Sequence, residues 1–159
     1  MTSPPPISPV RWAHDRLVLL DQRLLPTQEI ERACRRWEDV AEAIRTLVVR
    51  GAPAIGVAAA FGVALAARES GATTFDGLRA DLEAACRGLA ATRPTAVNLF
   101  WALERMKRVA LAARAQPLDQ LRARLLAEAQ AIHDADVAAN RAMGAHGAAL
   151  VPANARILT

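Results

Sequence analysis

The sequence predicts a mainly α-helical domain with a small antiparallel β-hairpin at its N-terminus. A length of 159 residues fits one domain of ordinary size. With 53% hydrophobic and 23% charged residues, the composition excludes a disordered chain. Alanine is the largest contributor to the apolar share, whereas aromatic residues make up 4% and tyrosine is absent. That balance favours close-packed helices over a β-sandwich, which draws on β-branched and aromatic residues.

The start of the chain predicts a flexible tail followed by the hairpin. Residues 1–9, MTSPPPISP, read as a tail because they lack the charged and apolar regions of a signal peptide. The hairpin covers residues 10–26 and is rich in Val and Leu. Its expected parts are a first strand, a turn, a second strand and a terminating proline: Val10–Trp12, His14-Asp15, Arg16–Leu25 and Pro26.

Six or seven helices are expected after the hairpin. Thr27 is a good N-cap residue, and Glu29 and Glu31 follow where the positive end of a helix favours acids, so the first helix runs to about Trp37. The later helices begin at capping residues or prolines, or show apolar side chains at helical spacing. They run from about Glu38 to Val49, from Pro53 to near Gly71, from after Thr74 through Leu89, from Pro94 through Met106, from Pro117 to near His133, and from Asp134 to Leu150. Whether the sixth breaks near His133 or continues stays open.

Three of these helices carry stripes whose packing can be anticipated. The third has small residues on one face, which favour close packing: Gly56, Ala60, Ala64 and Ala67. The fourth has an apolar stripe of Leu78, Leu82, Ala85, Cys86 and Leu89. The fifth is expected to face the core with Val97, Phe100, Trp101, Leu103 and Met106. The Ala- and Gly-rich last helix is expected to be close-packed as well.

The end of the chain predicts a strand without a neighbour. Pro152 closes the last helix, so the helical domain covers residues 10–152, and Ala155–Thr159 reads as the start of a buried strand. A lone strand is not stable in water. Residues 153–159 therefore either join the N-terminal hairpin or lead into a further domain.

Charge, hydropathy and cysteine usage exclude several classes. The formal net charge is +4, but bases alternate with acids along the chain, so no nucleic-acid groove is expected. The longest apolar run, Ala52–Ala67, is shorter than the roughly 20 residues of a membrane span, so no membrane partner is expected. Cys34 and Cys86 are isolated thiols on apolar stripes, which indicates buried structural cysteines and a reducing, cytoplasmic location.

The segment Arg50-Gly51-Ala52-Pro53 is the strongest candidate for a binding site. Gly51 allows an unusual turn, and Pro53 suits the first turn of a helix. The free N–H groups and the positive end of that helix are therefore expected beside the guanidinium of Arg50. This arrangement predicts an anion site; the alternative is a tight turn with Arg50 in solvent. Arg93 precedes a second expected helix start at Pro94, with Thr95 and Asn98 expected as a cap and its partner. The two arginines are candidates to converge on one phosphate.

Other catalytic patterns are not visible in the sequence. His14, His133 and His146 are far apart and lack partners at metal-ligand spacing, so no metal is expected. Asp134 and Asp136 lie on different faces of a helix and do not form a catalytic carboxylate pair. No nucleophile–base pair is apparent.

Four segments resemble the S-methyl-5-thioribose-1-phosphate isomerase family, and the resemblance runs in order from about Val10 to Thr159. The wider family also includes ribose-1,5-bisphosphate isomerases and the regulatory subunits of a translation-initiation nucleotide-exchange factor. The four segments are LVLLDQRLLP (Leu17–Pro26), VVRGAPAIGVAAAFGVALAA (Val48–Ala67), TRPTAVNLFWALERM (Thr92–Met106) and AIHDADVAANRAMGAHGAAL (Ala131–Leu150).

The resemblance implies an aldose–ketose isomerisation in methionine salvage, of 5-methylthioribose 1-phosphate to 5-methylthioribulose 1-phosphate, without a metal or organic cofactor. It implies that Arg50, Gly51, Ala52 and Arg93 bind the phosphorylated sugar and that the full-length protein is a homodimer. In the family a catalytic cysteine follows a strand like RILT, and a Rossmann-like domain after it supplies a catalytic aspartate. That domain is absent here, so catalytic residues are expected beyond Thr159 and this chain alone is expected to be inactive.

Two readings from different classes remain. The chain is either the N-terminal part of such an isomerase, or a non-catalytic regulatory or binding module of the exchange-factor type. The complete RGAPAIG and RPTAVNL motifs favour the isomerase.

Overall fold

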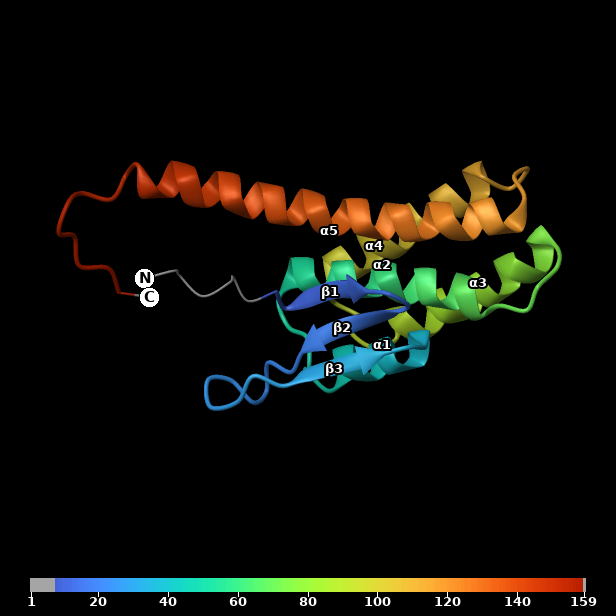
Figure 1. Cartoon of the computed structure of the whole chain (residues 1–159), viewed down its shortest axis with the longest axis horizontal. Helices are drawn as coiled ribbons and strands as arrows, with labels where there is room; N and C mark the ends of the chain where they lie inside the picture. The colour runs from blue at the N-terminus through green and yellow to red at the C-terminus, as the bar shows by residue number, and fades with distance from the viewer. Residues whose placement is uncertain (1–7, 159) are drawn as a thin grey trace.

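The computed structural model describes residues 8–158, and within them it contains five helices and one three-stranded sheet. The mainly helical class is therefore confirmed (Figure 1). The tail expected at residues 1–9 lies outside the described residues except for Ser8 and Pro9. The elements are β1 (Val10–Ala13), β2 (Arg16–Leu20), β3 (Glu31–Cys34), α1 (Trp37–Arg45), α2 (Ala52–Glu69), α3 (Phe75–Ala90), α4 (Val97–Ala112) and α5 (Leu118–Ala148).

The sheet has the order β1-β2-β3 and is antiparallel throughout. The predicted hairpin is present, but its second strand ends at Leu20 rather than at Leu25. The helix expected from Thr27 to Trp37 is wrong, because β3 pairs there with β2. Ile30, Ala33 and Cys34 have helical spacing, yet only Cys34 is buried, so this segment has no apolar stripe to pack.

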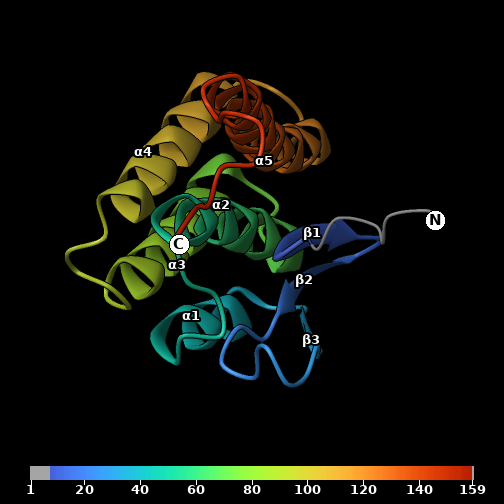
Figure 2. The same ribbon diagram turned by 90° about the vertical axis from the view of Figure 1, so that its left-hand side faces the viewer.

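Helix α2 is the centre of the core. It contacts the other four helices as well as β1 and β2 (Figure 2). All of its residues from Ile55 to Ala67 are buried, including the small-residue face that was expected to pack closely. By length and composition α2 is apolar enough to cross a membrane, but 72% of the qualifying window is buried by the rest of the chain. Its apolarity is therefore explained by its place in the core.

Helices α1, α3 and α4 hold α2 in place. Helix α1 ends at Arg45, earlier than expected, and Leu47 then adopts a left-handed φ of 63°. Thr74 caps α3 as predicted, since its hydroxyl accepts the N–H of Gly77 at 3.2 Å, and the expected stripe of α3 is buried. In α4, Leu103 and Met106 are buried as expected. Three others predicted to face the core are exposed: Val97, Phe100 and Trp101.

Helix α5 is one continuous helix through His133 and no helix forms from Thr27, so residues 8–158 contain five helices where six or seven were expected. Its last buried residue is Ile132. The following half projects past the other helices and is not close-packed (Figure 1). Residues 155–158 form no strand and are exposed, which contradicts the strand expected there, and Thr159 lies outside the described residues.

Substitution of Gly56 by alanine is expected to destabilise the fold by about 1–3 kcal/mol, the usual cost of overpacking. A methyl group on Gly56 would lie 2.8 Å from the main-chain oxygen of Asn98, so α2 and α4 would have to separate. The measurement is the free energy of unfolding in urea. Gly144→Ala is the matched control: no atom lies within 4 Å of its added methyl group, and gaining helix propensity raises stability by up to about 1 kcal/mol. Equal effects of the two substitutions would contradict the close approach.

Candidate functional site

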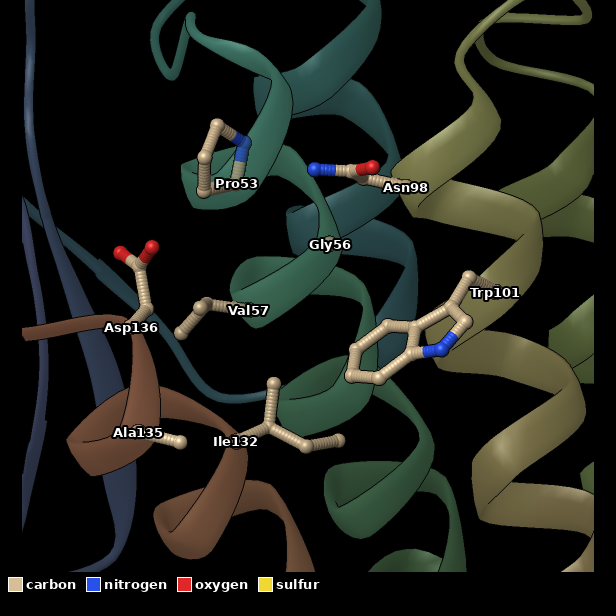
Figure 3. A pocket seen from close by; sticks show the side chains of 8 residues that line it. All are labelled: Pro53, Gly56, Val57, Asn98, Trp101, Ile132, Ala135 and Asp136. Carbon is tan, nitrogen blue, oxygen red and sulfur yellow. The ribbon is translucent and has the colours of Figure 1, made fainter. Parts of the chain in front are cut away.

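The first turns of α2 and α4 lie side by side at one end of the helical domain. The contact of Gly56 with the Asn98 backbone brings them together, and both helices run in the same direction from this end (Figures 1 and 3). The loop that precedes α2 contains Arg50, and the loop that precedes α4 contains Arg93. Three predicted site residues, Arg50, Gly51 and Arg93, therefore lie in these two loops, and the fourth, Ala52, is the first residue of α2.

The N-terminus of α2 is open to an anion. Gly51 is its N-cap with φ of 93°, a conformation that favours glycine, and no side chain caps the helix within the described residues. The Gly51 carbonyl accepts the N–H of Ile55 at 3.0 Å. Ala52 and Pro53 are exposed. The first-turn N–H groups and the positive end of the helix dipole thus face solvent, as an anion site requires.

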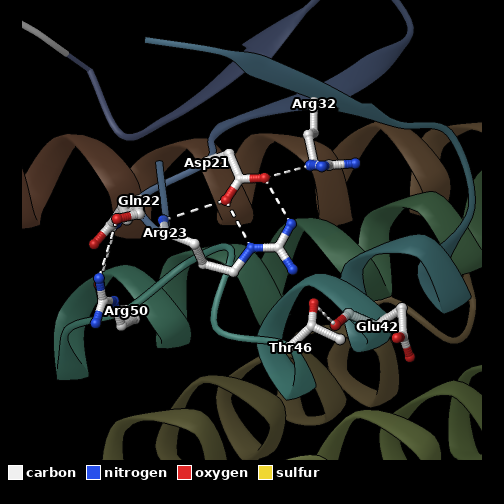
Figure 4. A network of polar contacts seen from close by, with 7 residues as sticks. All are labelled: Asp21, Gln22, Arg23, Arg32, Glu42, Thr46 and Arg50. Atoms are coloured by element: carbon white, nitrogen blue, oxygen red, sulfur yellow. Dashed lines mark hydrogen bonds and ion pairs between the residues drawn. The ribbon is translucent and has the colours of Figure 1, made fainter. Parts of the chain in front are cut away.

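Arg50 is exposed but is not a free surface arginine. Its Nη2 donates a hydrogen bond to the main-chain oxygen of Gln22 at 3.0 Å, and Gln22 Nε2 donates to the Arg50 carbonyl at 3.4 Å (Figure 4). Within residues 8–158 no carboxylate lies within ion-pair distance of Arg50. Arg50 is exposed, as the tight-turn alternative expected, and it also lies beside the uncapped start of α2, as the anion-site prediction requires. The guanidinium is held by one neutral group, the main-chain oxygen of Gln22, and its role toward an anion stays a prediction.

Arg93 is half-buried in the α3–α4 loop, but the helix start expected at Pro94 is wrong. The Arg93 carbonyl accepts the N–H of Ala96 in a turn, at 3.0 Å, and α4 begins only at Val97. The N-cap is Ala96, without a side-chain hydrogen bond, so Thr95 and Asn98 are not the expected cap and partner. A turn therefore separates Arg93 from the positive end of α4.

A cleft of about 320 Å³ lies between the first turns of α2 and α4 and the middle of α5 (Figure 3). Its walls are mainly apolar, with one amide and one carboxylate. The Asp136 carboxylate accepts a hydrogen bond from Asn140 Nδ2 at 3.0 Å. The lining residues are Pro53, Gly56, Val57, Asn98, Trp101, Ile132, Ala135 and Asp136.

Sequence patterns did not predict this cleft. They placed Trp101 in the core, where the structure leaves it 48% exposed beside Arg105. The available signal was the spacing of Asn98 and Trp101, which places both on one face of α4. The contribution of Asp136 could not be predicted from sequence, because it depends on α5 passing across the first turns of α2.

Titratable groups near the two loops do not form an acid–base pair. Burial raises the pKa of Cys34 and of Cys86 to about 11, and both thiols are buried as expected. His133 hydrogen-bonds Asp134 through Nδ1 at 2.9 Å and lines a different groove. Among residues 8–158 no three His, Cys, Asp or Glu side chains are grouped so that they hold a metal ion. Among the described residues the two loops thus offer hydrogen-bond donors and positive charge, but no acid–base pair beside them.

Both native thiols are expected to resist alkylation. A thiol with a pKa of about 11 is only about 0.1% thiolate at pH 8, and burial blocks the reagent as well. We expect no iodoacetamide adduct by mass spectrometry on the folded chain at pH 8, and two adducts after unfolding in guanidinium chloride. Rapid single labelling of the folded chain would show that one of the thiols is accessible.

Comparison with known proteins identifies a family and several relatives to which this chain is similar. A model of the Initiation factor 2 subunit family matches residues 48–159. The methylthioribose-1-phosphate isomerase of Syntrophotalea carbinolica is 57% identical over 153 residues, covering 96% of this chain and 44% of that protein. The protein of the same name from Geobacter sulfurreducens is 53% identical over 150 residues, covering 94% and 43%.

Two solved structures are similar in fold and sequence. The 5-methylthioribose 1-phosphate isomerase from Pyrococcus horikoshii OT3 superposes with a TM-score of 0.87 at 44% identity, covering 91% of this chain and 40% of that one. The translation initiation factor eIF-2B subunit delta from A. fulgidus superposes with a TM-score of 0.84 at 42% identity, covering 92% and 42%. The chain thus spans less than half the length of these relatives.

Proposed function

The chain belongs to the Initiation factor 2 subunit family, and from this we propose that it is the N-terminal, substrate-binding part of a methylthioribose-1-phosphate isomerase. The resemblance predicted from the four sequence segments is confirmed. Curated relatives named methylthioribose-1-phosphate isomerase match nearly the whole chain at 47–57% identity. The proposed reaction is the aldose–ketose isomerisation of 5-methylthioribose 1-phosphate to its ribulose form, a step of methionine salvage.

The observation that carries the proposal is the uncapped start of α2 beside a guanidinium without an acidic partner among the described residues. A sugar phosphate is a dianion near neutral pH, and helix N–H groups together with an arginine fork provide the donors that it prefers. In the proposed role Arg50, Gly51 and Ala52 bind the phosphate, and Arg93 reaches it from the neighbouring loop. The phosphorylated sugar is thus the proposed ligand of these two loops.

The apolar cleft suits the other end of such a substrate. Val57, Trp101 and Ile132 provide apolar walls close to Pro53 in the first turn of α2. Hydrogen transfer between C1 and C2 needs an acid, a base or a polarising environment. We propose that the part of the relatives that this chain does not span supplies it. A homodimer and a cytoplasmic location stay predictions.

The exchange-factor reading is not favoured. The A. fulgidus structure shows that the fold is shared with a translation-initiation subunit. The curated relatives that match the chain at 47–57% identity are nevertheless named as isomerases.

A chimera tests the proposal. In it, this chain replaces the matching 44% of the Syntrophotalea carbinolica relative, and turnover of 5-methylthioribose 1-phosphate is measured beside the unmodified relative. We expect turnover within about tenfold of the relative, and none of ribose 1,5-bisphosphate. A chimera that has a native circular dichroism spectrum but turns over neither sugar phosphate would contradict the proposal.

A second measurement does not depend on the chimera. In NMR spectra of the 159-residue chain, the amide signals of Gly51 and Ala52 are expected to shift on addition of 5-methylthioribose 1-phosphate. Unchanged signals at millimolar ligand would also count against the proposal.

A further inference from the structure

We infer that Gln22 is a positioning residue, whose main-chain oxygen holds the Arg50 guanidinium in place without a carboxylate, so that the full charge of Arg50 is available to an anion. The inference rests on the proposed phosphate-binding role of Arg50. Gln22 lies in the loop after β2, 28 residues before Arg50 in the sequence. Nothing in the sequence pattern links the two residues.

Three hydrogen bonds join Gln22 to the loop before α2. Its N–H donates to the Val48 carbonyl at 3.0 Å, and its own carbonyl accepts Arg50 Nη2 at 3.0 Å. Its side-chain Nε2 donates to the Arg50 carbonyl at 3.4 Å (Figure 4). One residue therefore contacts the guanidinium and also the peptide group from which that side chain departs.

Asp21, the residue before Gln22, is held in place by several hydrogen bonds, which fixes the position of the main chain at Gln22. Asp21 is fully buried, and its carboxylate accepts Arg23 Nε at 2.8 Å, Arg23 Nη2 at 2.7 Å and Arg32 Nε at 2.6 Å. Its N–H donates to the Ile30 carbonyl at 2.8 Å. Hydrogen bonds from Arg23 and Arg32 hold the pKa of the Asp21 carboxyl far below its usual range, so the group stays charged at neutral pH.

The arginines at Asp21 and the arginine at Gln22 differ in how much of their positive charge is available to a ligand. Arg23 and Arg32 share the carboxylate of Asp21, which offsets part of their charge, whereas Arg50 is held by a main-chain carbonyl, which orients it without cancelling its charge. An orienting contact reduces the side-chain entropy that is lost when a ligand binds. A carboxylate in place of the Gln22 amide would instead compete with an anion for Arg50.

The test compares Gln22→Glu with Gln28→Glu. Gln28 is an exposed glutamine of the same loop, and among the described residues its side chain makes no hydrogen bond. Both substitutions add one negative charge, but only the first lies beside Arg50, where the Gln22 side chain contacts the Arg50 carbonyl. The readout is the affinity for inorganic phosphate and for 5-methylthioribose 1-phosphate, from NMR titration of the 159-residue chain. All eight elements within residues 8–158 contribute side chains to one buried core.

We expect Gln22→Glu to weaken both affinities about tenfold and Gln28→Glu less than twofold, with unchanged melting temperatures. In an Arg50→Ala background, Gln22→Glu is expected to have less than a twofold effect, because the residue acts through Arg50. In the chimera, Gln22→Glu should raise KM about tenfold and leave kcat within twofold.

The outcomes separate the inference from the proposed function. Equal effects of the two glutamate substitutions, or an undiminished effect of Gln22→Glu in the Arg50→Ala background, would overturn the positioning role while the phosphate site stands. If Arg50→Ala alone leaves both affinities unchanged, the proposed phosphate site is wrong, and the positioning role of Gln22 fails with it.

Discussion

Replacing Arg50 by lysine is expected to raise the KM of the chimera for 5-methylthioribose 1-phosphate about ten- to hundredfold, although the positive charge is kept. Lysine presents a point charge on a flexible stem, whereas the arginine fork donates to Gln22 and, in the proposed role, also to a phosphate oxygen. Losing one charge-assisted hydrogen bond costs roughly 1.5–3 kcal/mol. Arg93→Lys is expected to act in the same direction.

The control for this prediction is Arg114→Lys. Arg114 Nη1 also donates to a main-chain carbonyl, that of Leu111 at 3.3 Å, but it follows the C-terminal end of α4, away from the loops of the site. Arg114→Lys is expected to leave KM within twofold. Unchanged kinetic constants in both Arg50→Lys and Arg93→Lys would show that neither arginine binds the phosphate.

Local periodicity predicted the helices well where one stripe meets a core within the same chain. The stripe of α3 illustrates this, because Leu78, Leu82 and Leu89 are spaced for one helix face and all are buried. Thr74 and Gly51 were likewise predictable, since capping and a positive φ depend on the residue itself and its immediate neighbours.

Strand β3 was not predictable from the same rules. Ile30, Ala33 and Cys34 match helical spacing, but the segment instead forms a strand that pairs with the free edge of β2. Two of its charged side chains then meet partners across the sheet: Glu31 accepts from Arg11 at 2.6 Å, and Arg32 donates to Asp21 at 2.6 Å. Such pairings join residues far apart in sequence, which a local window does not contain.

In the candidate site, too, local sequence patterns indicated some residues and missed others. Arg50, Gly51 and Pro53 could be proposed from sequence because a guanidinium, a turn glycine and a helix-starting proline lie close together. The contact of Arg50 with Gln22 could not be predicted, because it spans 28 residues. Trp101 and Val97 were assigned to the core on apolarity alone, yet nothing within the described residues covers them fully. A sequence pattern states that a side chain is apolar and leaves open which surface covers it.

The 159-residue chain alone is expected to show no isomerase turnover, a complete loss relative to the chimera. Its loops are proposed to bind a phosphate, but among the described residues no acid–base pair lies beside them. Asp136 is tied to Asn140, and both thiols are buried with a pKa of about 11. Without a group that moves hydrogen between C1 and C2, binding alone does not lower the barrier to that step. The measurement is product formation by NMR over several hours at millimolar substrate, with the chimera as the active control. If the chain alone turns over the substrate, and Arg50→Ala abolishes that turnover, the prediction is contradicted. A hydrogen-transferring group would then lie within these residues, and the cleft that contains Asp136 would be the first region to mutate.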